Sequence, residues 1–286
     1  MSSNPFLVET DWLSSQLGES DLSVVDASWY LPTMLANGEP RNGRKEYAER
    51  HIPGAVYFDV DTISEPGSNL PHTLASADVF AQMVGELGIS NDDRIVVYDG
   101  MGLFSAARAW WNFRVMGARE VFVLNGGLPK WIEEGLPLEA GTPTRQGKTF
   151  NASSDESAVA SFETMLEIVN SGSQQITDAR PAARFTGEAP EPRAGMRSGH
   201  MPGAASVPFS ELAKDGQLRS ADELRQVFEN AGIDLDKPVV TTCGSGVTAA
   251  ALTLALETIG HTDHKLYDGS WAQWGGRDDT PVVTDS

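Results

Sequence analysis

The only cysteine of the sequence, Cys243, occupies a position suited to nucleophilic chemistry. It follows the β-branched run VVTT and precedes GSGVT, after which an apolar helical pattern begins. A loop between a strand and a helix N-terminus points backbone N–H groups inward and ends at the positive pole of the helix dipole. Both features stabilise an anion, so they favour the reactive thiolate form of a cysteine. We therefore predict that Cys243 is a nucleophile, the alternative being a buried structural cysteine.

The residues that follow Cys243 are suited to surround an anion. Gly244 and Gly246 have no side chain and let the backbone wrap closely, while Ser245 and Thr248 add hydroxyl donors. The sequence therefore predicts a loop that holds a thiolate by many weak donors rather than by one cationic side chain.

The same succession of short motifs occurs in both halves of the chain, which indicates an internal duplication. Each half has an apolar run ending in Asp-Ala, a His-x-Pro-Gly-Ala unit, a Gly-rich loop after a β-branched run, and a turn closed by Trp. The matched residues are Asp26 and Asp178, His51 and His200, Asp99 and Cys243, and Trp131 and Trp274. We expect the first half to be catalytically silent, because its loop has no thiol. The two histidines are expected to be structural parts of their turns.

Short strand-like runs alternate with helical patterns in each half. Runs at 24–26, 55–58, 95–98 and 121–124 have the β-branched or aromatic composition of buried parallel strands. Two helices are predicted to start after Ser76 and Ser220 and to stop at Gly88 and Gly232. The alternation predicts an α/β fold of parallel sheets with helices on both faces, and ligands beyond the carboxyl ends of the strands. We expect domains over 1–140 and 159–286, joined by a linker over 141–158 rich in Gly, Pro, Thr and Ser.

The doubled HxPGA unit, the CGSGVT loop and the Gly-x-Trp closures resemble the tandem-domain sulfurtransferases of the rhodanese superfamily. The resemblance runs from about Phe6 to Trp274, and the loop is similar to that of the branch whose sulfur donor is 3-mercaptopyruvate. It implies two rhodanese-like domains, a persulfide intermediate on Cys243 and release of pyruvate. The implied acceptor is a thiol such as thioredoxin or glutathione, or cyanide.

The resemblance also implies which residues bind the donor. Arg184 and Arg193 match family positions that hold the 2-oxo acid, and a guanidinium fits a carboxylate as a fork. The loop residues that would contact the substrate are Gly244, Gly246, Val247 and Thr248. The alternative for the arginines is that they are surface residues of a Pro-rich loop.

Some members of this branch use an Asp-His-Ser relay, which Asp61, His72 and Ser245 match. Such a relay could move the proton of the substrate thiol or ketone, because histidine titrates near neutrality. The sequence departs from the family at Ala75, where a proline is usual. A solvated His72 with an unrelated Asp61 is therefore the alternative.

Three other functions fit parts of the sequence. A thiosulfate:cyanide sulfurtransferase is less favoured, because members that prefer the dianion have basic residues where this chain has Gly244 and Ser245. A dual-specificity phosphatase needs arginine six positions after the cysteine, where Ala249 stands. The third is a non-catalytic rhodanese-type binding or regulatory module, against which the retained thiol argues.

The composition of the 286 residues excludes some partners. There are 21 Lys and Arg against 40 Asp and Glu, and the formal net charge of −19 repels nucleic acid. The sequence lacks an apolar run of about 18 residues and a signal-peptide pattern, so we expect a cytoplasmic protein without membrane attachment. A lone cysteine forms no intrachain disulfide. Neither a metal nor another cofactor is expected, and His261 and His264 are expected in a surface loop.

Overall fold

The computed structural model describes residues 4–285, which form two compact units. The first unit contains the residues up to Pro66 together with Leu74–Asp155 and Asp215–Leu218. The second contains Gly67–Thr73, Glu156–Lys214 and the residues from Arg219 onward. A short piece of the first half of the sequence, around residue 70, therefore belongs to the second unit.

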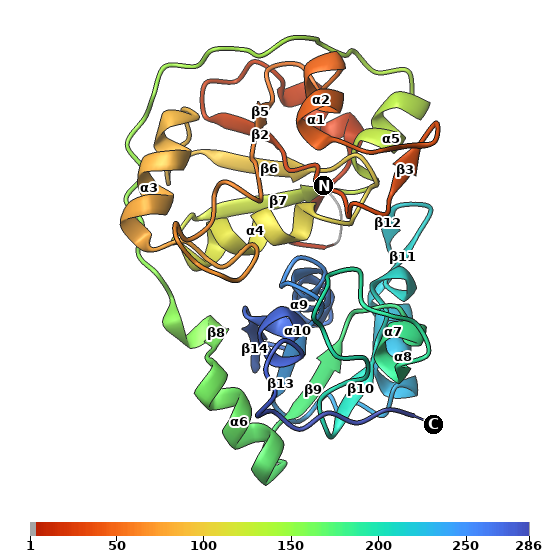
Figure 1. Ribbon diagram of the computed structural model, residues 1–286. Coiled ribbons are helices and arrows are strands. Elements are labelled where there is room, and N and C mark those ends of the chain that lie inside the picture. The colour runs from red at the N-terminus through yellow and green to blue at the C-terminus, as the bar shows by residue number, and fades with distance from the viewer. Residues whose placement is uncertain (1–3, 286) are drawn as a thin grey trace. The chain divides into compact units, whose positions relative to one another are not determined.

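The first unit is built on a five-stranded parallel sheet in the order β1-β7-β6-β2-β5 (Figure 1). One sheet face packs on three helices through a core that includes Val24, Val96 and Trp131. The other face is covered by α4, against which α3 packs through Phe80 and Phe113. The elements are β1 Leu7–Val8, α1 Thr10–Gln16, β2 Leu22–Asp26, β3 Leu35–Ala36, β4 Glu39–Pro40, α2 Gly43–Glu49, β5 Val56–Tyr57, α3 Ala77–Glu86, β6 Arg94–Tyr98, α4 Ala106–Val115, β7 Glu120–Leu124 and α5 Gly127–Glu133.

The second unit repeats this plan with the parallel sheet order β10-β9-β13-β14-β8. Ile176, Val240 and Tyr267 on one face pack against α6 and α10, while α9 covers the other face with α8 beside it. The predicted α/β fold is thus confirmed in both units. The elements are η1 Glu156–Ala158, β8 Val159–Ala160, α6 Phe162–Ser171, β9 Gln175–Asp178, α7 Ala182–Thr186, β10 Ala204–Ser206, η2 Phe209–Glu211, β11 Ala213–Lys214, β12 Gln217–Leu218, α8 Ala221–Asn230, β13 Val239–Thr242, α9 Ala249–Thr258, β14 His264–Tyr267 and α10 Ser270–Trp274.

The two helices predicted from their serine starts are α3 and α8. Each ends two residues before a glycine with positive φ, +76° at Gly88 and +81° at Gly232, as the sequence predicts. Their N-termini differ. Ser220 and Glu223 form a complete capping box on α8, whereas the Ser76 side chain makes no capping bond on α3.

The segment from 141 to 155 has no helix or strand, yet it is held against the first unit. The side chain of Phe150 is buried against Phe80, and Lys148 Nζ lies 2.8 Å from both carboxylate oxygens of Asp93. These contacts, together with backbone hydrogen bonds such as that from Lys148 N to Gly85 O, hold this irregular strap against the first unit.

The expectation of a surface loop is wrong for His264 and only partly right for His261, which lies in a loop but is buried. His264 begins β14, and the buried ring of His261 has both nitrogens within 3.0 Å of backbone carbonyl oxygens, those of Leu235 and Asp263. Polar residues on both sides made this stretch resemble a loop, but the ring satisfies carbonyl groups at the start of the strand.

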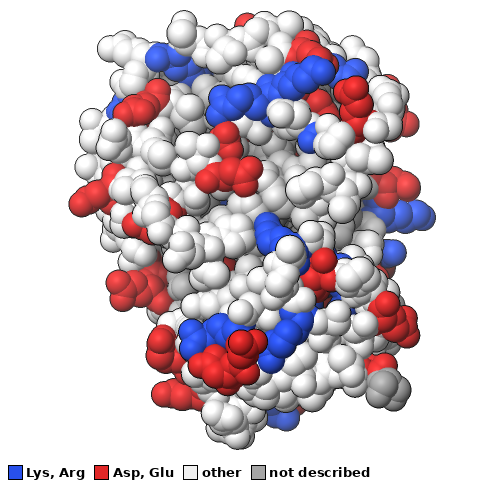
Figure 2. Space-filling model, in the orientation of Figure 1, with Lys and Arg blue, Asp and Glu red and all other residues white. Residues whose placement is uncertain are grey.

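On the face shown in Figure 2, charged residues of both signs are present. In the view of Figure 2, acidic side chains are scattered over the face, with basic side chains among them. None of the helices within residues 4–285 has the length and apolar character needed to cross a bilayer.

Candidate functional site

Cys243 lies directly after β13 and six residues before the start of α9, at the carboxyl end of a central strand. The residue is 2 % exposed. Its amide donates to Ser270 Oγ at 3.3 Å, and its carbonyl accepts from the Trp271 amide at 2.9 Å. The thiol is therefore carried by a backbone that is fixed at both its donor and its acceptor.

Ser270 anchors this backbone, and sequence reasoning did not single it out. Its φ is +48°, in the left-handed region that residues with a β-carbon rarely occupy. Its hydroxyl donates to Tyr267 O at 2.9 Å and accepts from both Cys243 N and Thr242 Oγ. The only signal was its place in the DGSW turn, which matches a glycine, Gly127 with φ +54°, in the first unit.

The loop after Cys243 is closely wrapped. Gly246 has φ +80°, a conformation that favours glycine, and the Val247 side chain is buried. Thr248 is half-buried and caps α9 without a side-chain capping bond. The contacts of Gly244, Gly246, Val247 and Thr248 with a donor molecule stay predictions.

His72 and Ser245 meet although 173 residues separate them in sequence. His72 Nδ1 lies 3.0 Å from Ser245 Oγ, and both residues are buried. His72 has φ +60°, so its backbone is held in an unfavourable region to present the ring. Two of the three predicted relay residues are thus in hydrogen-bond contact.

Asp61, the third predicted relay residue, lies in the first unit. Its Oδ1 accepts a hydrogen bond from Trp29 Nε1 at 3.0 Å. The role of Asp61 in a relay stays a prediction.

Arg184 lies beside the cysteine loop. Its guanidinium is carried by α7, and a β-carbon at Gly244 would lie 3.1 Å from its Nη2 atom. Nε and Nη2 both donate to Glu191 Oε2. Arg193, the second predicted arginine, is half-buried, and its function stays a prediction.

Arg184 is part of a network of alternating charges that also contains Asp178, Arg180 and Glu191. Arg180 is 1 % exposed. Its Nε and Nη2 donate to the Asp178 carboxylate, and its Nη1 donates to Glu191 Oε1 at 2.7 Å. Burial alone would lower the pKa of Arg180, but Asp178 and Glu191 outweigh it and hold that pKa above its ordinary value. Sequence reasoning used Asp178 only as a mark of the repeat and missed Glu191.

The matching loop of the first unit holds a carboxylate where the second holds the thiol. Four backbone N–H groups donate to Asp99 at 2.7 to 2.8 Å, and the residue is buried. The donors are Met101, Phe104, Ser105 and Ala106. The loop of the first unit is therefore a cradle of backbone donors around a carboxyl group.

The histidines of the two HxPGA units are structural, as the sequence predicts. Nδ1 of His51 lies 2.8 Å from Tyr47 O, and Nδ1 of His200 lies 3.0 Å from Phe185 O. Each ring also stacks on the aromatic side chain of that same partner. Among the described residues, no group of three or more His, Cys, Asp or Glu side chains could hold a metal ion.

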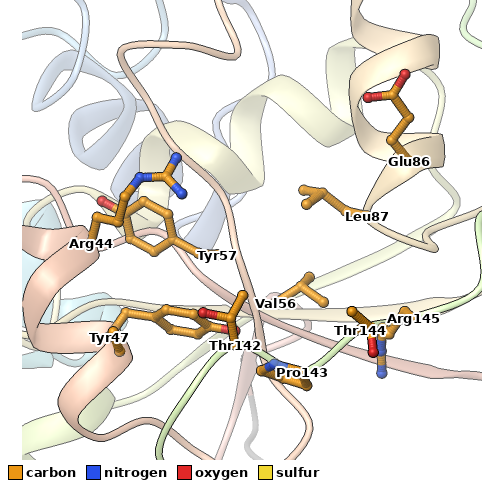
Figure 3. Close-up of a pocket in the computed structure, with 11 residues that line it drawn as sticks. Arg44, Tyr47, Val56, Tyr57, Glu86, Leu87, Thr142, Pro143, Thr144 and Arg145 are labelled. Atoms are coloured by element: carbon orange, nitrogen blue, oxygen red, sulfur yellow. The ribbon is translucent and has the colours of Figure 1, made fainter.

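A separate cavity of about 480 Å³ lies in the first unit, between α2, α3 and the strap at 142–145 (Figure 3). The guanidinium of Arg44 lies over the Tyr57 ring, 5.0 Å from its centroid. The lining residues include none of those predicted for thiol chemistry. This cavity is therefore not the cysteine site.

Comparisons with known proteins find relatives and solved structures that match nearly the whole chain. The 3-mercaptopyruvate sulfurtransferase of Escherichia coli strain K12 is 43 % identical over 280 residues, which cover 98 % of each chain. The thiosulfate sulfurtransferase of Gallus gallus is 43 % identical over 275 residues, 94 % of this chain and 92 % of that one. The crystal structure of the E. coli 3-mercaptopyruvate enzyme superposes with a TM-score of 0.85 at 42 % identity, covering 93 % and 98 % of the two chains.

A family model confirms the duplication. The Rhodanese-like domain matches twice, at residues 9–134 and 161–277, and each match contains four of the five strands of one parallel sheet. The chain therefore belongs to the rhodanese family.

Proposed function

We propose that this protein moves sulfur from 3-mercaptopyruvate, through a persulfide on Cys243, to a thiol or cyanide acceptor and releases pyruvate. The observation that carries the proposal is the guanidinium of Arg184 beside Gly244, next to the lone thiol. A 2-oxo acid with a terminal thiol offers a carboxylate for such a cation and a sulfur for such a nucleophile. The printed names of relatives at 40–43 % identity support the same reaction.

The reaction balances without an external oxidant or reductant. The Cys243 thiolate attacks the donor sulfur, the carbon–sulfur bond breaks, and its electron pair leaves on the enolate of pyruvate. Protonation of the enolate gives pyruvate. An acceptor thiolate or cyanide then attacks the outer sulfur and returns Cys243 as thiolate, so one difficult transfer becomes two easier ones.

The chain's own residues suit these steps. Arg184, with Arg193 as a proposed second cation, would hold the carboxylate and ketone oxygens. The loop backbone of Gly244, Gly246, Val247 and Thr248 would surround the sulfur, as the Asp99 cradle surrounds a carboxylate. The pair of Ser245 and His72, in contact at 3.0 Å, can pass a proton at Ser245 Oγ. Asp61 would complete this relay in the proposed mechanism.

Thiosulfate is the second candidate donor, and the relative named thiosulfate sulfurtransferase favours it. Against it stands the neutral loop, because the positions after Cys243 are Gly244 and Ser245 rather than basic residues. The ratio of kcat/KM for the two donors decides between them. We expect the ratio to favour 3-mercaptopyruvate, and a clear preference for thiosulfate would reverse the order of the two proposals.

The phosphatase and the non-catalytic module are weaker proposals. Ala249, the first residue of α9, stands where a phosphatase would need arginine to hold phosphate. A binding module would have no need of a buried cysteine in the loop. Absence of sulfur transfer from every donor would favour the module.

The remaining proposals concern the domain boundaries, the sulfur acceptor and the location of the protein in the cell. We keep 1–140 and 159–286 as the proposed domains, with a catalytically silent first domain in which Asp99 replaces the thiol. The acceptor is proposed to be a small thiol such as glutathione, a protein thiol such as thioredoxin, or cyanide. The proposed location is the cytoplasm, where thiols stay reduced.

The direct test is mass spectrometry of the protein after treatment with 3-mercaptopyruvate. We expect one added sulfur atom on Cys243 and stoichiometric pyruvate. In Cys243→Ser the hydroxyl nearly keeps the volume but lacks the nucleophile, so transfer should fall to background with the circular-dichroism spectrum unchanged. Pyruvate release by this variant at the parent rate would show that Cys243 is not the nucleophile.

A further inference from the structure

The orientation of Arg184 depends on one residue of the loop that follows α7. Both hydrogen bonds that Arg184 donates, from Nε and Nη2, go to Glu191 Oε2. The Glu191 side chain is 3 % exposed, while that of Arg184 is 15 % exposed. Within the described part of the chain Nη1 of Arg184 makes no hydrogen bond, so this end of the fork is available to a ligand.

Glu191 is itself fixed from the sheet. Its Oε1 accepts from Arg180 Nη1 at 2.7 Å, and Arg180 donates further to Asp178 and to the Gly199 carbonyl at 2.9 Å. Asp178 is the last residue of β9, the strand next to β13. The buried charges thus form a rigid network that begins at Asp178, the carboxyl end of β9.

The same network of buried charges also contacts the residue that hydrogen-bonds the cysteine backbone. The Arg180 guanidinium lies over the Trp271 ring, 4.2 Å from its centroid, and the Trp271 amide donates to Cys243 O. Arg184 and Cys243 are therefore both held relative to Arg180. A side chain that binds the far end of the donor gains most when it is fixed relative to the reacting atom.

We propose that Glu191 is a positioning residue that holds the Arg184 guanidinium beside Gly244 and so sets the affinity for the donor's carboxylate; this inference rests on the proposed function. Without the Glu191 charge, the bonds from Arg184 would lose their charge assistance, because an amide has one neutral acceptor oxygen for two guanidinium groups, and Arg184 would face the buried cation of Arg180. The repulsion would turn Arg184 away from the loop. The loss of orientation outweighs the gain from freeing Arg184 of a competing carboxylate.

The test is Glu191→Gln, with Glu188→Gln as a matched control. Glu188 is exposed, lies three residues away in the same loop, and loses the same charge. With saturating acceptor, we expect Glu191→Gln to raise KM for 3-mercaptopyruvate about tenfold, the effect of one charge-assisted hydrogen bond, with a much smaller change in kcat. Glu188→Gln should keep the parent KM. Glu191→Asp, which keeps the charge but shortens the reach, should lie between them.

A double-mutant cycle separates positioning from general support of the fold. If Glu191 acts through Arg184, Arg184→Ala and the double variant should have the same KM. The proposal would be overturned if the KM of the double variant exceeded that of Arg184→Ala by the factor that Glu191→Gln alone causes. An unchanged or lowered KM in Glu191→Gln would overturn it as well. A parent protein that releases no pyruvate would instead refute the proposed function, whatever the variants do.

Discussion

Asp99 and Cys243 occupy matching positions in the two loops of the repeat. In the first unit four N–H groups converge on a carboxylate, and the same loop in the second unit begins with a thiol. A carboxyl group has no nucleophilic sulfur, so we propose that the Asp99 loop is structural. The same kind of donors would favour the thiolate form of a cysteine, and we propose that Cys243 reacts in that form. We therefore propose that the residue at this one position decides which half of the repeat is catalytic.

Asp26 and Asp178 form a second matched pair with different surroundings. Asp178 forms an ion pair with Arg180. Asp26, in contrast, accepts a hydrogen bond from the Ser28 amide at 2.9 Å. Burial raises the pKa of Asp26 from 3.8 to about 6, because hydrogen bonds from Ser28 and Tyr98 only partly offset the loss of water.

We predict that Asp26 makes the protein less stable as the pH rises. Its folded pKa lies above its unfolded value, so the folded state holds the proton more tightly between about pH 4 and 6. The stabilisation by the protonated form is complete below pH 4 and is lost as the pH passes 6, in total about 3 kcal/mol. Urea unfolding of the parent and of Asp26→Asn from pH 4 to 7 should show their free-energy difference fall by this amount. A difference that is constant with pH would contradict the assignment.

Local sequence predicted the residues whose role depends on their own neighbours in the chain. Cys243 was predicted as the nucleophile from a strand, two glycines and a helix within a few positions; the strand and helix are confirmed, and the role stays a prediction. The contact of His72 with Ser245 spans 173 residues, and only the family resemblance could suggest it. Glu191 gave no signal, because its function depends on two arginines that the turn after β9 brings together. His264 was misplaced since a short polar strand start reads like a loop.

At the scale of elements, the repeat supplies two helices with nearly the same start and different caps. On α8 the Ser220 hydroxyl accepts from the Glu223 amide, and the Glu223 carboxylate accepts from the Ser220 amide. On α3 the Ser76 side chain makes no capping bond, although its amide donates to Glu65 at 2.7 Å. The sequence pattern SAD predicts both helices but not this difference, which depends on the residue at the third helical position.

We therefore predict that Ser220→Ala lowers the free energy of unfolding by about 1 kcal/mol, the usual cost of losing a helix cap. Ser76→Ala should change it by only a few tenths, since no capping bond is lost. Urea midpoints of the two variants, measured with the parent in the same buffer, compare these values directly. Equal losses in both variants would show that the capping box is not what stabilises the start of α8.

At the scale of the whole molecule, the acidic surface opposes the proposed substrate. The net charge of −19 creates a negative field, and the donor is an anion. The network beside Cys243 contains two arginines and two carboxylates, so its attraction is local and does not extend far beyond the loop. Long-range repulsion and short-range attraction respond differently to salt. The Debye length falls from about 30 Å at 0.01 M to about 8 Å at 0.15 M.

This difference gives a test that uses the lone thiol itself. Iodoacetate and iodoacetamide both alkylate cysteine, but only iodoacetate carries a charge. Added salt should remove the repulsion by the whole molecule while leaving contacts of a few ångströms at the Arg184 side of the loop largely intact. We expect the ratio of the iodoacetate rate to the iodoacetamide rate to rise severalfold between 0.01 and 0.15 M salt, with kcat/KM for 3-mercaptopyruvate rising in parallel. A ratio that falls with salt would mean that the local arginines, and not the overall charge of −19, govern the approach of anions to Cys243.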